Sequence, residues 1–225
     1  MVLFYVINFN DDERKQRMID RFSSINIDLQ FIDPVYENDH RLFDTNLYKR
    51  TSSIMIQHLD SIKHFYEKTS AKYCVVCEDD IHISKNLAND LPELIKNFEE
   101  LKLDILLLGY LFPHSLNENW HFPVLKDTEK YNYHGYPDDI WGSQMYLISR
   151  DHAKNILDKY TIEWAVENIE RTHYNPDWTI TKFGKRAVIS PMIAVEEGVD
   201  KSGHQGQTHF HVICHEHNYN KDVHI

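Results

Sequence analysis

A short apolar segment that ends in three consecutive acids constrains this chain more than any other feature. Residues 73–77 have no helical period, and Glu78, Asp79 and Asp80 follow them directly. Such a run is typical of a strand buried in a parallel sheet. Because an uncompensated buried charge is very costly, the acids must lie at the carboxyl end of this strand. In open α/β sheets, ligands bind at that edge.

The spacing of the acids predicts a metal site. Glu78 and Asp80 are two residues apart, so their side chains point the same way on extended chain. Two converging oxygen ligands suit a hard divalent cation such as Mn²⁺ or Mg²⁺. The alternative interpretation is an acidic turn that only ends the strand.

The remaining pattern predicts one α/β domain over residues 1–225, with a mixed, mostly parallel sheet flanked by helices. Residues 2–7 and 29–32 form predicted strands, and the helix between them begins at Asn10 as its cap, with Glu13 completing a capping box. A second helix is expected over residues 51–68 and a third from its cap Asp90. Further strands are expected at residues 104–108, 143–148, 187–189 and 193–195. Residues 111–140 are expected to form loops with a short hairpin that could cover the site.

Charge and composition argue against a nucleic-acid-binding, a secreted or a membrane-spanning protein. The net charge is −11, with 24 Lys+Arg against 35 Asp+Glu, which argues against a nucleic-acid surface. Cys74, Cys77 and Cys214 are interpreted as small core residues in a reducing compartment. The first eight residues lack the basic region of a signal peptide, and the longest apolar run, residues 105–112, is too short to cross a bilayer. We therefore expect a soluble, cytoplasmic protein with no transmembrane segment.

Several pieces of the sequence, in order, resemble one enzyme family. The chain is similar to the lipopolysaccharide-type glycosyltransferases of family 25, which have the nucleotide-sugar-binding GT-A fold. The histidine-rich end departs from that family's pattern. The resembling pieces are Tyr5-Val6-Ile7-Asn8 with Arg14 and Arg17, then Ser53 and His58, residues 77–81, residues 142–149, Asp177-Trp178, Pro191 and Glu196.

The resemblance implies metal-dependent transfer of a sugar from a nucleoside diphosphate sugar, a UDP-sugar first, to a glycan or another hydroxyl acceptor. Residues 1–110 would bind the nucleotide and residues 111–225 the acceptor. Asp80 would be the main metal ligand, and Glu78 would hold the metal or the ribose. The donor-binding candidates are Val6, Asn8, Arg14, Arg17, Asp33, Asp79 and Gln144.

The chemistry of such a transfer asks for further groups. A leaving nucleoside diphosphate gains charge, which a bound metal stabilises as a Lewis acid. Two carboxylates rarely complete a metal site, and in GT-A enzymes a histidine near the chain end often supplies another ligand. His209 and His211 are the candidates because they would share a face on extended chain. The alternative is a polar tail with no function. His204, His215 and His217 lie in the same region.

An inverting transfer also needs a general base. Asp177 is the first candidate and the pair Asp138 and Asp139 the second; the alternatives are a helix cap for Asp177 and turn residues for the pair. A retaining transfer needs no such base, and Gln144 would then line the sugar. Some aromatic residues could stack on sugars, although most of them are expected to pack in the core: Tyr110, Trp120, Tyr133, Tyr136 and Trp141.

Two other functions fit the same residues less well. A metal-dependent nucleotidyltransferase or phosphohydrolase would share the acids. A non-catalytic module would bind glycans or a metal through the histidine-rich end. The sequence has 7 glycines and no glycine-rich phosphate loop or Gly-x-Ser-x-Gly elbow, which disfavours several other enzyme classes.

Overall fold

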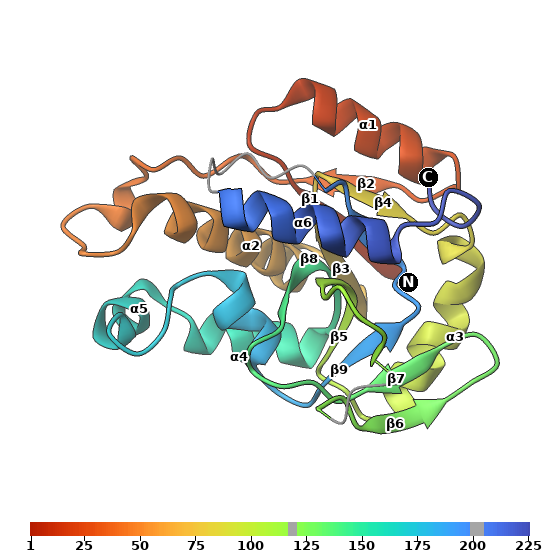
Figure 1. Ribbon diagram of the computed structural model, residues 1–225. Coiled ribbons are helices and arrows are strands. Elements are labelled where there is room, and N and C mark those ends of the chain that lie inside the picture. Colours follow the sequence, from red (N-terminus) through yellow and green to blue (C-terminus); the bar gives the residue numbers. More distant parts are fainter. Residues whose placement is uncertain (117–120, 199–204) are drawn as a thin grey trace.

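The computed structural model describes residues 1–116, 121–198 and 205–225, and it has the expected α/β architecture (Figure 1). A sheet of eight strands has the order β2-β1-β3-β8-β5-β9-β7-β6. Strands β8 and β7 run opposite to the other six, so the sheet is mixed and mostly parallel. The strands are β1 (Val2–Ile7), β2 (Leu29–Phe31), β3 (Tyr73–Glu78), β5 (Ile105–Leu111), β6 (Val124–Asp127), β7 (Asn132–His134), β8 (Trp141–Ser149) and β9 (Arg186–Ser190).

Helices cover both faces of this sheet, and α1 and α2 lie on opposite sides of β1 and β2 (Figure 1). The α-helices are α1 (Asp12–Ser23), α2 (Lys49–Lys68), α3 (Leu87–Glu100), α4 (Arg150–Lys159), α5 (Ile162–Asn168) and α6 (Gln205–Asn218). Short 3₁₀ turns are η1 (His40–Leu42), η3 (Pro176–Trp178) and η4 (Ile180–Lys182). No helix in the described part of the chain combines the length and the apolar composition that a bilayer crossing needs.

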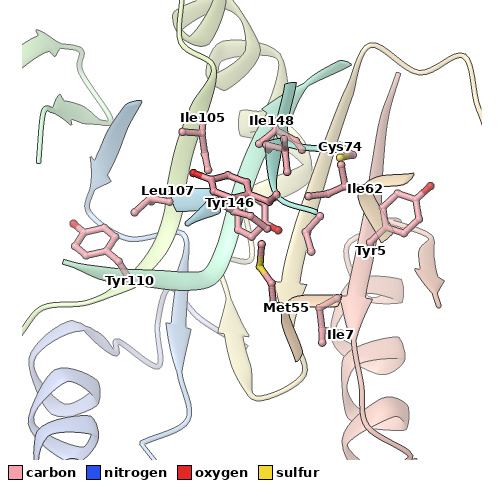
Figure 2. Packing of buried hydrophobic residues seen from close by; sticks show 14 of the residues in the cluster. Tyr5, Ile7, Met55, Ile62, Cys74, Ile105, Leu107, Tyr110, Tyr146 and Ile148 are labelled. Atoms are coloured by element: carbon pink, nitrogen blue, oxygen red, sulfur yellow. The ribbon is translucent and has the colours of Figure 1, made fainter. Parts of the chain in front are cut away.

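The sheet separates two apolar cores, as alternation along its strands requires. In β1, Tyr5 and Ile7 face the core covered by α2 and α4, whereas Phe4 and Val6 face the core covered by α1 and α3. Figure 2 shows the first core, where Met55 and Ile62 of α2 pack on strand residues. Burial on both faces explains why these strands read as continuous apolar runs.

Strand β3 ends where the sequence predicted, and its cysteines are core residues. Cys74 and Cys77 are fully buried, reduced and in different cores, and burial raises the pKa of both thiols well above its ordinary value. The expected hairpin within residues 111–140 is β6 with β7.

Two predicted helix caps are wrong. Helix α1 is capped by Asp11, whose side chain accepts from the Arg14 backbone N–H at 3.0 Å. Asn10 instead has a φ of 53°, a left-handed conformation that asparagine tolerates, and its amide donates to the Tyr36 hydroxyl. Helix α3 begins at Leu87, before Asp90, and Asp90 accepts hydrogen bonds from Lys130 and Tyr131.

A small second sheet brings the end of the chain to the acids. Strand β4 (Ile81–Ile83) pairs antiparallel with β10 (Ala194–Glu196). The Glu197 backbone N–H donates to the Asp80 carbonyl at 2.7 Å. Strand β10 lies close against β5, since a Cβ on Gly109 would be 2.8 Å from the Ala194 carbonyl oxygen. Glu196 is thereby fixed beside the acidic edge.

His58 of α2 is a core histidine, and its burial predicts an acid-sensitive fold. The ring is fully buried, with Nδ1 2.9 Å from the Tyr146 hydroxyl, and burial lowers its pKa from 6.5 to about 3. Below pH 6.5 the unfolded chain therefore binds a proton that the folded protein does not, so the free energy of unfolding falls with pH. At pH 5 this loss is about 2 kcal/mol.

Urea unfolding of the parent and of His58→Gln at about pH 7.5 and about pH 5 measures this effect. Because glutamine does not titrate, the variant should lose about 2 kcal/mol less than the parent between the two pH values. An equal loss in both proteins would show that His58 does not cause the acid sensitivity.

Candidate functional site

The three acids after β3 line a cavity of about 520 Å³ at the carboxyl edge of the sheet. We call it the acidic cavity. Its walls come from the ends of β1 and β3, from α1, α2 and α6, and from β10. The sequence prediction that Glu78, Asp79 and Asp80 share one edge is thus confirmed. The lining residues are Ile7, Phe9, Asp11, Arg14, Glu37, Arg50, Ser53, Ile54, Gln57, Glu78, Asp79, Asp80, Glu196 and His211.

Asp79 is fully engaged inside the protein. Its Oδ2 accepts from Asn8 Nδ2 at 2.6 Å, and its Oδ1 accepts from Arg14 Nη1 at 2.9 Å. Gln57 Nε2 donates to the Asn8 carbonyl at 2.9 Å. Asp79 therefore connects the end of β1 and helix α1 to β3. Asn8 is part of this connection, because it donates to Asp79 and accepts from Gln57.

Asp80 is only half engaged. Its Oδ2 accepts from Arg14 Nη1 at 3.1 Å, but its Oδ1 is buried and has no hydrogen-bond partner within the described residues. Burial is the main reason that the pKa of Asp80 rises to about 6; Arg14 opposes the rise, and Glu196 and Asp79 add to it. A buried carboxylate that lies beside other carboxylates attracts a cation.

Glu78 is linked to Asp177 through the start of β8. Ser143 Oγ donates to Glu78 Oε1 at 2.7 Å. Asp177 Oδ1 accepts from the backbone N–H groups of Gly142 and Ser143 at 2.8 and 2.9 Å. Burial raises the pKa of Glu78 well above its ordinary value, and the charges of Asp80 and Asp177 raise it further. Asn175, not Asp177, caps η3.

The chain end supplies His211 and not His209 to the acidic cavity. Both residues lie in α6, so the expectation that they share a face on extended chain is wrong: two residues on a helix are about 200° apart. His211 lines the cavity with its Nδ1 3.1 Å from Glu196 Oε2, whereas His209 is exposed outside it. His204 lies outside the described residues.

Sequence reasoning missed a role for Glu196, which entered only as a piece of the resemblance. Its side chain is 6% exposed, lines the acidic cavity and raises the pKa of Asp80. The signal was present, because an acid that directly follows the apolar residues 193–195 repeats the pattern of β3.

The donor set of Asp80, Glu196 and His211 suits a divalent cation in its chemistry. Carboxylates with one imidazole are ligands of Mn²⁺. The buried Asp80 Oδ1, which has no hydrogen-bond partner among the described residues, is an oxygen that such an ion would satisfy. Within residues 1–116, 121–198 and 205–225, no three ligand-type side chains already converge on one point. The donor set is therefore present, and the side chains would have to move to close around an ion.

The structure places the other predicted donor residues away from the cavity. Arg17 pairs with Glu13 and Glu197, Val6 is a core residue, and Asp33 is exposed. Gln144 is 5% exposed in β8, and its Oε1 has no hydrogen-bond partner in the described part of the chain.

Asp138 and Asp139 line a second cavity of about 580 Å³, and Asp138 pairs there with Arg186. Of the aromatic candidates for sugar stacking, Tyr110, Tyr133 and Tyr136 are buried core residues, Trp141 is half-buried, and Trp120 lies outside the described residues.

A protein of known structure has the same fold as this chain. The sequence matches no protein-family model, and no curated protein matches it. A solved structure of a glycosyltransferase involved in the glycosylation of the major capsid of PBCV-1 is 12% identical, with a TM-score of 0.51 over 92% of this chain and 97% of that chain. The present chain has the fold of that glycosyltransferase. The expected α/β class is thus confirmed, and the resemblance to family 25 stays a prediction.

Two further similar structures are more distant. A protein from STIV has a TM-score of 0.44 at 13% identity, covering 83% of this chain and 80% of its own. CMP:2-keto-3-deoxy-manno-octonic acid synthetase complexed with CTP has a TM-score of 0.38 at 12% identity, covering 83% and 88%. These similarities are too weak to support an argument about function.

Proposed function

We propose that this protein is a cation-dependent glycosyltransferase that moves a sugar from a nucleoside diphosphate sugar, a UDP-sugar first, to a hydroxyl of a glycan acceptor. The observation that carries the proposal is the buried, half-engaged carboxylate of Asp80 in the acidic cavity. The fold that the chain shares with a glycosyltransferase agrees with it.

The charges of the acidic cavity support a requirement for a cation. Among the described residues, six carboxylates line it, against the two arginines Arg14 and Arg50. A nucleoside diphosphate is itself an anion, so it would be repelled from this lining. A divalent cation bound between the protein and the diphosphate would reverse the repulsion, and Mn²⁺ or Mg²⁺ suits the oxygen ligands.

Each group then has a definite task. Asp80, Glu196 and His211 would hold the cation, which when bound stabilises the charge of the departing diphosphate as a Lewis acid. Arg50 lines the cavity, is exposed and forms no ion pair with the described residues, so its guanidinium is available for a phosphate. Arg14 keeps Asp79 in place and neutralises part of the acidic edge.

Asp177 is the candidate base for an inverting transfer. Its Oδ1 already accepts two backbone N–H groups, so Oδ2 is the oxygen that would take the proton of the acceptor hydroxyl. If the transfer retains configuration, Asp177 serves only to hold the start of β8.

Donor binding can be tested by thermal melting with UDP and Mn²⁺. At a hundredfold excess over the dissociation constant, binding stabilises the folded protein by about 2.7 kcal/mol. The melting temperature should then rise by roughly 5 to 10 °C. Asp80→Asn should abolish the shift, whereas the control Asp28→Asn, an exposed carboxylate outside the cavity, should keep it.

The products separate this function from its nearest alternative. With a panel of nucleotide sugars, a glycosyltransferase releases the nucleoside diphosphate and elongates the acceptor. A nucleotidyltransferase or phosphohydrolase using the same acids would release pyrophosphate or phosphate. Release of either without sugar transfer, or a melting temperature that UDP and Mn²⁺ leave unchanged, would contradict the proposal.

A further inference from the structure

The second cavity differs from the acidic cavity in both shape and chemistry. Its volume of about 580 Å³ falls within the roughly 300–1,000 Å³ of small-molecule sites. Three phenylalanine rings line it, and they come from separate segments of the chain: Phe112 after β5, Phe122 before β6, and Phe210 of α6. We call it the aromatic cavity.

Helix α6 has one residue in each cavity. Phe210 lines the aromatic cavity, and the next residue, His211, lines the acidic cavity. The ring of Trp141 contacts the Phe210 ring edge-on, with centroids 5.8 Å apart. Trp141 directly precedes Gly142 and Ser143, which bind Asp177 and Glu78. The aromatic cavity therefore adjoins the residues proposed to carry the transfer.

The charges of the aromatic cavity favour a neutral ligand over an anionic one. Within the described residues, no lysine or arginine lines it. Its charged groups are the carboxylates of Asp138, which pairs with Arg186, and of Asp139, which accepts no hydrogen bond and forms no ion pair in the described part of the chain. The carboxylate of Asp139 disfavours a phosphate or nucleotide there, whereas a hydroxyl group could donate a hydrogen bond to it.

Aromatic rings beside an acceptor oxygen fit a neutral sugar. A pyranose presents an apolar C–H face and a rim of hydroxyls. Phenylalanine rings offer a large apolar surface to such a face, and a few placed polar groups fix the orientation of a ligand in a mostly apolar pocket. His114 also lines the cavity, is exposed, and can exchange a hydrogen bond with a second hydroxyl.

We propose that the aromatic cavity binds the acceptor as a neutral pyranose residue of a glycan, packed on Phe210 and Phe112, with one of its hydroxyl groups donating a hydrogen bond to Asp139. The inference rests on the proposed function, since it names the acceptor class of the same transfer. Helix α6 then contributes to both cavities, with His211 lining the acidic cavity and Phe210 lining the aromatic cavity.

Glycan binding can be measured independently of catalysis. The full chain is applied to an array of neutral and anionic glycans, and the best neutral glycan is then titrated by calorimetry without nucleotide or metal. Phe210→Ala and Asp139→Asn should each weaken its binding about tenfold, and Phe210→Tyr should restore most of it because the ring is kept. Asp28→Asn should bind as the parent does.

The outcomes distinguish this inference from the proposed function. Phe210→Ala and Asp139→Asn should retain the melting shift with UDP and Mn²⁺, which also shows that they are folded. Glycan binding that both variants leave unchanged, preference for anionic glycans, or no binding to any neutral glycan would overturn the inference while the UDP shift still stands. Loss of the UDP shift in the parent would instead overturn the proposed function.

Discussion

Replacing Asp80 with asparagine is expected to lower sugar transfer by about a thousandfold, the scale seen when one preorganised electrostatic group is lost from an active site. Asparagine has nearly the same shape, so the change removes the charge and leaves the packing. Oδ1 of Asp80, which accepts no hydrogen bond from the part of the chain that the structure describes, is the oxygen that a cation would use, and an amide is a weaker ligand there. Initial rates with a UDP-sugar and Mn²⁺ measure the loss.

The same variant should be more stable than the parent when no metal is present. Because the pKa of Asp80 is raised to about 6, its ionised form destabilises the folded protein without metal at neutral pH. In the parent, the contribution of Asp80 to the free energy of unfolding should therefore rise as the pH falls from about 7.5 through 6, because the carboxylate becomes protonated. Asp80→Asn carries no charge at this position, so it should already have this extra stability at about pH 7.5. Full activity in the variant, or a lower melting temperature at neutral pH, would contradict the assigned role.

Replacing Gly109 with alanine is expected to destabilise the protein by about 3 kcal/mol, at the upper end of what overpacking a core produces. The new Cβ would lie 2.8 Å from the Ala194 carbonyl oxygen and 2.9 Å from the Ala194 Cβ. These are backbone and first side-chain atoms, so β10 itself would have to shift. Glu196 belongs to β10, so the shift would also weaken the response to Mn²⁺.

Gly206 offers a matched control for this substitution. It lies in α6, and a Cβ there would have no heavy atom of the described residues within 4 Å beyond its chain neighbours and its own helix. Gly206→Ala should be neutral or stabilise by up to about 1 kcal/mol, because alanine favours the helix. Urea unfolding of the two variants separates the effects. If Gly109→Ala were as stable as Gly206→Ala, the close approach of β10 to β5 would be refuted.

The acidic edge could be predicted from sequence because its signal is local. An apolar strand followed by Glu78, Asp79 and Asp80 needs no knowledge of the rest of the chain. The pairing of Arg14 with Asp79 and Asp80 could not be predicted from the sequence, because it joins side chains that are 65 and 66 residues apart. The position of β8 between β3 and β5 is likewise a property of the assembled sheet.

The end of the chain shows the same limit. His209 and His211 are two residues apart in the sequence. Their side chains point the same way on an extended chain but in nearly opposite directions on a helix. The weak apolar periodicity of residues 205–218 did not reveal the helix, because α6 is stabilised where it packs on β10. Once the helix is known, His211 is the histidine beside Glu196.

The arrangement around Asp79 bears on how mutations in this motif should be read. Both of its oxygens hold the end of β3 to the end of β1 and to helix α1, whereas Asp80 has one oxygen that accepts no hydrogen bond from the described residues. Alanine at any of the three positions would reduce turnover, and an activity assay alone would give all three the same importance. Measuring folding beside turnover would separate a loosened scaffold from a missing ligand.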